Sequence, residues 1–344
     1  MGRRAAFTIN DHVIAPGQRR TVDVPVSTLS DHTPVNLSVH VIHGRKPGPV
    51  LFVSAAIHGD EVIGVEIVRR LLKAKALTGM AGTLLAVPIV NSFGFHNHSR
   101  YLPDRRDLNR CFPGLSGGSL ASRLAHIFIT EVVSRADVGI DLHSAAIHRA
   151  NLPQIRLTPG NDRLVGLGRA FGAPVMLEAK LREGSLRMAA EEAGVDVLLY
   201  EGGEGLRLDE LAARAGVSGI LRVMQALAMI SGRGVPKIRY QPVLAGDTHW
   251  LRAPAGGVFR GYVAIGAAVT EGTVLGAVTD PFGEVEEEIT AEQRGIVIGR
   301  TNMPVVNEGD ALFHIAETSR AERAAEGVTA HIEAAPLHDE DEII

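Results

Sequence analysis

The sequence is poor in the residues and segments that mark several classes of protein. It has a single cysteine, Cys111, among 344 residues, which excludes an internal disulfide and a cysteine-rich zinc site. It contains no run of about 18 apolar residues, so we expect no membrane-spanning helix. The first residues, MGRRAAFTINDH, have no apolar stretch behind the arginines and do not resemble a signal peptide. These absences predict a soluble cytoplasmic protein.

Charge is not concentrated in blocks of one sign. The formal net charge is −4, from 35 basic and 39 acidic residues, and no basic field is large enough to predict nucleic-acid binding. Hydrophobic residues make up 45% of the chain, which is enough for a sizeable core and for two domains. We therefore expect a small-molecule partner and neither a nucleic acid nor a membrane. The sequence leaves a homo-oligomer open.

Buried strands alternate with amphipathic helices over much of the chain. Apolar runs such as PVLFVSAAI, GTLLAVPIVN and VDVLLYEGG stand between stretches with helical spacing at 62–77, 120–135 and 208–231. This alternation predicts an α/β fold, a mixed sheet with helices on both faces. Residues 1–45 add alternating segments that predict N-terminal strands. We expect a first domain to span residues 1–240.

Residues 241–318 change to short strands and many glycines. GGVFRGYVAIGAAVTEGTVLGAV and RGIVIGRTNMPVVNEGDALFHI share their glycines and an EG-x-x-L ending, which predicts a β-rich domain of the barrel-sandwich type. It resembles a biotinyl or lipoyl carrier domain, but its hairpin DPFGEVEEE has no lysine to modify. We expect a wall or lid beside the active site, with His249 and Trp250 either reaching in or only packing. Residues 319–344 are rich in Ala and Glu, which is compatible with a short helix, and we expect them to form an acidic, mobile tail.

A histidine and two carboxylates follow the apolar run LFVSAAI, in the segment HGDE. Asp60 and Glu61 fit a helix N-terminus, where carboxylates are favourable. Alternatively, His58 and Glu61 are two of the three ligands of a catalytic zinc. The third ligand should then lie at the carboxyl end of another buried strand.

The segment VGIDLHS provides such a ligand. His143 ends this apolar run, and Asp141 lies two residues earlier on the same face of the strand. We therefore expect His143 to complete the metal site. Asp141 is close enough along the strand to hydrogen-bond to a metal-binding side chain and fix its orientation.

A third strand end, in VDVLLYEGGEG, carries Glu201 before a pair of glycines. A carboxylate that is buried beside a site needs a compensating charge. A zinc ion with its water would supply that charge, and Glu201 would then accept the proton of the water. The alternative is a glutamate that caps a helix or forms a salt bridge before a glycine turn.

The loop SRYLPDRRDLNRCFPG, residues 99–114, concentrates arginines around Asn109. Guanidinium groups bind carboxylates through two hydrogen bonds and stabilise oxyanions. A solvated basic loop is the alternative, although the Phe-Pro-Gly ending argues for an ordered turn. We expect Cys111 to pack and not to act as a nucleophile. The arginines are Arg100, Arg105, Arg106 and Arg110.

The segments HGDE, DLNRCFPG, DLHS and YEGGE, in this order and spacing, resemble the succinylglutamate desuccinylase/aspartoacylase family, which has a zinc carboxypeptidase-like fold. The motifs cover residues 48–205, and the family's β-rich C-terminal domain fits residues 243–315. The resemblance implies one Zn²⁺ per chain, bound by His58, Glu61 and His143. It also implies that Glu201 is the general base.

The resemblance implies further substrate contacts. Asn109 and Arg110 match the pair that holds the α-carboxylate of the amino-acid half of the substrate. Extra residues before DLNR leave the oxyanion-stabilising arginine open, with Arg105 favoured over Arg100 and Arg106. Arg187 is the nearest match to an arginine that holds a side-chain carboxylate, but it lies further from Glu201 than in the family pattern. An N-acetylaspartate or succinylglutamate substrate therefore does not follow from the sequence.

Three functions compete. The first is a zinc-dependent amidohydrolase that removes the acyl group from an N-acyl amino acid or a related small amide. The second is a zinc carboxypeptidase acting on short peptides, which needs an open groove that the β-rich domain would restrict. The third is a non-catalytic binding protein, which has no need of a base such as Glu201. The sequence favours the first.

Overall fold

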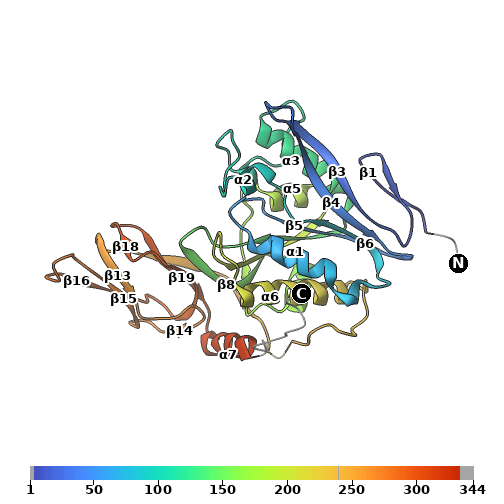
Figure 1. Ribbon diagram of the computed structural model, residues 1–344. Helices are drawn as coiled ribbons and strands as arrows, with labels where there is room; N and C mark the ends of the chain where they lie inside the picture. The colour runs from blue at the N-terminus through green and yellow to red at the C-terminus, as the bar shows by residue number, and fades with distance from the viewer. Residues whose placement is uncertain (1–3, 239, 334–344) are drawn as a thin grey trace.

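The computed structural model describes residues 4–238 and 240–333 (Figure 1). Within these ranges, thirteen strands form one large mixed sheet. Helices pack on both of its faces, as the sequence predicts. The helices are α1 (Ile63–Lys73), α2 (Ser92–His96), α3 (Leu120–Glu131), α4 (Asp162–Phe171), α5 (Leu186–Glu192), α6 (Glu210–Ala226) and α7 (Ala321–Glu333), with short 3₁₀ turns η1 (Lys75–Leu77), η2 (Leu108–Arg110) and η3 (Val133–Arg135).

The large sheet runs in the order β12-β19-β17-β8-β10-β7-β5-β6-β4-β3. Strands β10, β7, β5 and β6 are parallel to one another, so their carboxyl ends meet at one edge. The strands are β1 (Phe7–Ile9), β2 (His12–Ile14), β3 (Arg19–Thr28), β4 (Pro34–His43), β5 (Lys46–Ala55), β6 (Ala81–Val87), β7 (Val138–His143), β8 (Arg149–Leu157), β9 (Val175–Glu178), β10 (Asp196–Gly203), β11 (Val243–Ala245), β12 (Thr248–Arg252), β13 (Gly257–Gly261), β14 (Ala268–Val269), β15 (Val274–Thr279), β16 (Glu286–Thr290), β17 (Gly295–Thr301), β18 (Val305–Val306) and β19 (Ala311–Glu317).

The two faces of the sheet are covered by different helices. One apolar core lies between the sheet and helices α1, α4 and α6, and it includes Ile140 and Leu142 of β7. A second core lies on the opposite face, under α3 and α5. Because side chains alternate along a strand, Asp141 and His143 point to this second face. The chemistry-bearing residues of β7 therefore lie on the α3/α5 side.

The C-terminal β-rich region continues the large sheet. Its strand β17 pairs with β8, and β11 pairs with β9. The two sequence repeats form β13–β15 and β17–β19, and each short middle strand pairs with the other repeat, β14 with β17 and β18 with β13. A separate apolar core fills this sandwich. The predicted β-rich region is present. The large sheet continues across the predicted domain boundary at residues 240 and 241.

Within the segment expected to be a tail, residues 321–333 form helix α7. Ala321, Ala324 and Val328 are buried, and the helix contacts β14 and β17. Spacings of three and four residues place these small apolar side chains on one helical stripe. The rest of the predicted tail, 334–344, lies outside the described residues. Among the helices described, none is long and apolar enough to cross a membrane.

Candidate active site

The first segment of the site is the turn between β5 and α1, which carries His58 and Glu61. The Glu61 N–H donates to the carbonyl oxygen of His58 at 3.1 Å. A Cβ at Gly64 would lie 2.7 and 2.9 Å from side-chain atoms of β5 and β7, so the first turn of α1 needs glycine to rest directly on the two strands. This close approach brings Glu61 beside His143.

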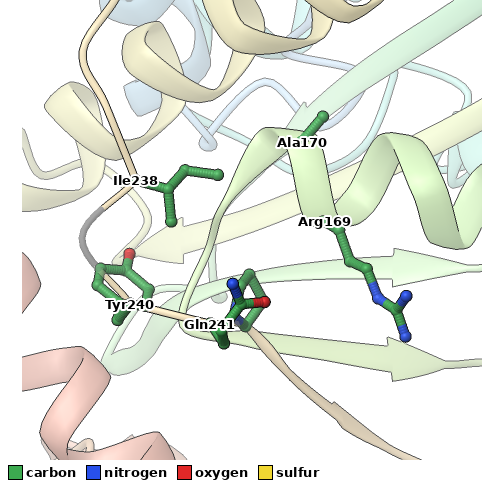
Figure 2. Close-up of a pocket in the computed structure, with 6 residues that line it drawn as sticks. Arg169, Ala170, Ile238, Tyr240 and Gln241 are labelled. Atoms are coloured by element: carbon green, nitrogen blue, oxygen red, sulfur yellow. The ribbon is translucent and has the colours of Figure 1, made fainter.

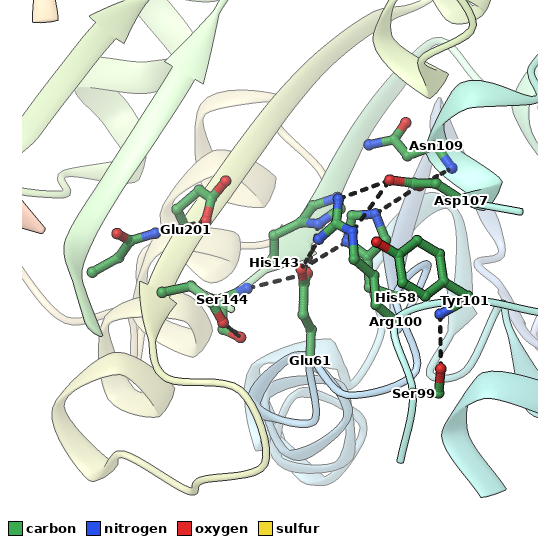
Figure 3. A network of polar contacts seen from close by, with 12 residues as sticks. His58, Glu61, Ser99, Arg100, Tyr101, Asp107, Asn109, His143, Ser144 and Glu201 are labelled. Atoms are coloured by element: carbon green, nitrogen blue, oxygen red, sulfur yellow. Dashed lines mark hydrogen bonds and ion pairs between the residues drawn. The ribbon is translucent and has the colours of Figure 1, made fainter. Parts of the chain in front are cut away.

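His58, Glu61 and His143 converge on one point (Figure 3). Nδ1 of His58 lies 2.7 Å from Glu61 Oε1, and Nδ1 of His143 lies 2.7 Å from Glu61 Oε2. One ligand atom from each residue lies within 4.8 Å of the others, and all three residues are buried. The structure thus brings together the three residues predicted to bind a metal.

Two further carboxylates hold the outer nitrogens of the imidazole rings. His143 Nε2 lies 2.7 Å from Asp141 Oδ2, and His58 Nε2 lies 3.1 Å from Asp107 Oδ1. Carboxylates placed behind metal-binding imidazoles fix the orientation of the ring. The sequence pointed to Asp141 for such a contact. It missed Asp107, although this is the acidic residue of the DLNR motif.

Electrostatics in this cluster favour a positive charge at its centre. Burial alone would raise the pKa of the Glu61 carboxyl, but the charges of His58 and His143 hold it well below its usual range. Burial alone would lower the pKa of His143, but Asp141 and Glu61 raise it well above its usual value. Two imidazoles and one carboxylate, each oriented by its neighbours, are a donor set that fits Zn²⁺.

Glu201 lies on the strand beside His143. Strand β10 runs parallel to β7, with Glu201 in register with His143. Asn151 Nδ2 donates to Glu201 Oε2 at 2.9 Å, and Arg156 Nη2 lies 3.8 Å from Oε1. Sequence reasoning missed Asn151, because its position depends on how β8 pairs with β10.

Of the three arginines considered for the oxyanion, Arg100 contacts the cluster of His58, Glu61 and His143. Its Nη1 lies 3.4 Å from Glu61 Oε1, and its Nη2 donates to Asp107 Oδ2 at 2.9 Å. Its side chain is 30% exposed, against 3% for that of Glu61, so it stands where the cluster meets solvent. Arg105 and Arg106 are exposed, and the described residues include no polar contact between either of them and the cluster.

The other predicted substrate contacts lie nearby without joining the cluster. Asn109 is buried, and its Oδ1 accepts the N–H of Leu186 at 2.8 Å, which ties η2 to α5. Arg110 is exposed. Arg187 is buried on α5, where its Nη2 donates to the carbonyl oxygen of Ala179 at 2.9 Å.

The two aromatic candidates of the β-rich region pack within it. Trp250 stacks on His314 with ring centroids 4.5 Å apart, and the guanidinium of Arg149 lies 5.3 Å from the centroid of the indole ring. His249 Nδ1 lies 2.9 Å from Glu317 Oε1. In the described part of the chain, neither His249 nor Trp250 contacts His58, Glu61 or His143.

A pocket of about 430 Å³ lies elsewhere, on α4 and the segment that precedes β11 (Figure 2). Helix α4 covers the face of the sheet opposite to the metal-ligand cluster. The pocket therefore contributes nothing to the chemistry of the cluster. Its lining residues are Arg169, Ala170, Ile238, Tyr240, Gln241 and Pro242.

Residues 47–227, more than half of the chain, match the succinylglutamate desuccinylase/aspartoacylase catalytic domain. The chain belongs to this family. The family membership and the fold implied by the sequence motifs are thereby confirmed. The family name indicates a hydrolase of the deacylase type, which acts on amide bonds.

One relative from Halomonas elongata is named N-alpha-acetyl-L-2,4-diaminobutyric acid deacetylase. It is 28% identical over 288 residues, which cover 79% of this chain and 83% of the relative. This second name agrees with a deacylase.

Several solved structures share the fold. A succinylglutamate desuccinylase/aspartoacylase from Rhodobacter sphaeroides superposes with a TM-score of 0.76 at 24% identity, covering 87% of this chain and 95% of its own. The product-bound Ectoine utilization protein EutE (DoeB) from Ruegeria pomeroyi gives a TM-score of 0.77 at 24% identity, covering 88% and 95%. Coverage of this extent includes strands of the β-rich region as well as the catalytic domain.

Proposed function

We propose that this family member is a zinc-dependent deacylase that hydrolyses the amide bond of an N-acyl amino acid or a related small amide. The observation that carries the proposal is the convergence of His58, Glu61 and His143, with Glu201 on the adjacent strand. A binding protein would have no need of a carboxylate oriented at that position.

His58, Glu61 and His143 would hold one zinc ion per chain. When bound, zinc makes water more acidic and polarises a carbonyl group. Asp107 and Asp141 keep the two imidazole rings turned toward Glu61, so the ligand atoms are oriented before any ion arrives.

Glu201 would act as the general base. Its carboxylate, oriented by Asn151, takes a proton from the attacking water as the new C–O bond forms at the acyl carbon. It then returns that proton to the amine nitrogen as the C–N bond breaks, so that the base is regenerated. Arg100, which has donors at the solvent-facing side of the cluster, is the arginine best placed to stabilise the oxyanion. Asn109 and Arg110 remain assigned to the α-carboxylate by the family resemblance.

A zinc carboxypeptidase acting on short peptides is the alternative function. It would use the same ligands and base. The continuation of the sheet from β8 into β17 supports the deacylase, because the β-rich region lies on the Glu201 side of the site and would restrict a long substrate.

Metal analysis combined with a substrate panel tests the proposal. We expect about one zinc per wild-type chain, a loss of that metal in His143→Ala, and its retention in the control His96→Ala, which changes an exposed histidine of α2. Wild-type protein should release the amine from N-acyl amino acids. Cleavage of dipeptides alone would favour the peptidase, and failure to bind zinc on reconstitution would contradict both enzymes.

A further inference from the structure

The outer edge of strand β8 is paired with two different parts of the molecule. Residues 154–157 pair with β9, whereas residues 149–151 pair with β17 of the β-rich region. Asn151 belongs to the second group. It pairs with Gly203 of β10 on one side and with Gly299 of β17 on the other. This residue therefore stands between the strand that carries Glu201 and the β-rich region.

A β-bulge brings the Asn151 side chain to the face of the sheet that carries Glu201. On β10, Glu201 pairs with Gln154. Two residues later, Gly203 pairs with Asn151, which lies three residues before Gln154. Strand β8 thus carries one extra residue here, and without it Asn151 and Gln154 would face opposite sides of the sheet. The bulge lies in the Leu-Pro step of RANLPQIRL, where the proline has no N–H to lose from the strand pairing.

Asn151 holds the Glu201 carboxylate. Its Nδ2 donates to Glu201 Oε2 at 2.9 Å, whereas Arg156 Nη2 lies 3.8 Å from Oε1, too far for a hydrogen bond. Among the residues that the structure describes, no other side chain or N–H donates to this carboxylate. The Glu201 side chain is 13% exposed, so little of it is open to water that could replace the amide. Its orientation therefore depends on Asn151.

Glycines flank Asn151 on both neighbouring strands. A Cβ at Gly299 would lie 2.9 Å from Asn151 Oδ1, so a larger residue there would push the amide away. Because the clashing atom is the end of a side chain, the amide would move and the backbone of β17 need not. Gly203 has a φ of +75°, which disfavours a side chain at that position. The space that the Asn151 amide occupies is therefore left open by β17 and β10.

We propose that the β-rich region positions the general base: Gly299 of β17 seats the Asn151 amide, and this amide holds Glu201 in one orientation. The proposal rests on the proposed deacylase, in which Glu201 takes a proton from water and returns it to the amine nitrogen. A carboxylate that serves two positions in turn gains from being held where both are within reach. Asn151 and Gly299 are positioning residues, because they act through Glu201. The β-rich region then contributes to kcat as well as restricting the substrate.

Asn151→Ala tests the hydrogen bond to the base, with an N-acyl amino acid that the wild type hydrolyses. Because a hydrogen bond to a charged group is lost, kcat should fall by about 10- to 150-fold, with little change in KM and none in zinc content. Asn151→Asp, which is nearly isosteric and serves if the alanine variant does not fold, places a second carboxylate beside Glu201. It should also lower kcat and move the acidic limb of its pH profile to higher pH, because a like charge raises the pKa of a carboxyl group. A loss expressed in KM alone would overturn the proposal.

Gly299→Ala tests whether β17 acts through Asn151. This variant should also lower kcat. The control Gly246→Ala, in the same β-rich region, adds a Cβ with nothing within 4 Å of it and should keep the wild-type kcat. In the Asn151→Ala background, Gly299→Ala should cause no further loss, because the amide that it displaces is already absent. Losses that multiply in the double variant would overturn the proposal, since Gly299 would then act by another route.

The side-chain amide signal of Asn151 tests the same contacts without turnover. In proton–nitrogen correlation spectra of the full chain, this signal is identified by its absence from Asn151→Ala. A hydrogen bond to a carboxylate shifts one of its protons downfield, so Gly299→Ala should move the signal toward that of a free amide, and Gly246→Ala should not. An unchanged signal in Gly299→Ala would overturn the proposal. If the wild type hydrolyses no N-acyl amino acid, the deacylase fails, and this comparison still decides whether β17 holds Asn151 against Glu201.

Discussion

The two sides of the candidate site differ in how their polar groups are satisfied. On the β5/β7 side, His58 lies between Glu61 and Asp107, and both ring nitrogens have partners. On the β8 side, Gln154 keeps two polar atoms that pair with nothing in the described ranges. Side chains whose polar atoms all have hydrogen-bond partners are held in place before a ligand binds, which suits a permanently bound metal ion. Buried polar groups without partners, in contrast, are groups whose hydrogen bonds a bound ligand can complete.

Glu201 stands between these two sides, and its replacement gives the largest expected effect. In Glu201→Gln the proton acceptor is lost while the side-chain shape is kept, so kcat should fall by about 10² to 10⁴. Zinc content should not change, because Glu201 is not one of the three ligands. Steady-state kinetics and metal analysis on the same preparations measure both quantities.

The matched control is Glu204→Gln in the same YEGGE segment. Glu204 accepts hydrogen bonds from the His148 N–H and from Asn302, away from the metal ligands, and its replacement should leave kcat near the wild-type value. Loss of zinc from Glu201→Gln would mean that Glu201 helps to bind the metal. Equal losses of activity in both variants would mean that Glu201 has no special role as a base. Either outcome would contradict the assignment of Glu201 as the general base.

The metal side could be predicted from the sequence because each of its segments carries a local signal. His58 and Glu61 follow one apolar run and His143 ends another, and the carboxyl ends of parallel strands meet at one edge of a sheet. The same alternation of strands and helices predicted the α/β core. The repeats predicted the β-sandwich, since their shared glycines lie at corresponding places: Gly257 and Gly261 in β13 match Gly295 and Gly299 in β17, and Gly272 and Gly309 lie in the turns before β15 and β19.

The β8 side could not be predicted in this way. Asn151, Gln154 and Arg156 lie in RANLPQIRL, which has no clean alternation of apolar and polar residues. Their positions depend on the antiparallel pairing of β8 with β10 and on a shift of register between Glu201 and Gly203. Pairing partners and register are set by contacts distant in sequence, which a local pattern does not contain.

Asp107→Asn tests whether the metal side is oriented by its outer carboxylates. Asp107 contacts both His58 and Arg100, and a neutral amide would hold the imidazole less firmly and make it a weaker ligand. Zinc affinity should therefore fall by about 10- to 100-fold, as measured by competition with a chelator. Asp104→Asn, in the same loop but outside the cluster, should bind zinc as the wild type does. Equal affinity in all three proteins would show that the ring needs no such support.

Ion pairs on the surface give a third case for comparison. Their charges are paired, as in the cluster of His58, Glu61 and His143, but they are exposed to solvent. Arg70 joins Glu66 of α1 to Glu210 of α6, with N–O distances of 2.6 and 2.7 Å. The Glu210 side chain is 52% exposed, so solvent screens much of the attraction. Hydrogen bonds from Arg69 and Arg70 lower the pKa of Glu66 to about 2, and those from Arg70 and Arg214 lower the pKa of Glu210 to about 2.

Arg70→Met should reduce the free energy of unfolding by about 1 kcal/mol at pH 7, the smallest effect predicted for this protein. The folded pKa values of both glutamates lie below their unfolded values of about 4.3, so the stabilisation is complete above that pH and is lost as the pH falls toward 2. The difference between variant and wild type, measured by urea unfolding, should shrink across this window. It should also shrink in 1 M salt, where the screening length is about 3 Å. A difference that persisted at pH 2 would assign the effect to packing of the aliphatic part of the Arg70 side chain. The ion pairs of Arg70 would then contribute nothing to the contact between α1 and α6.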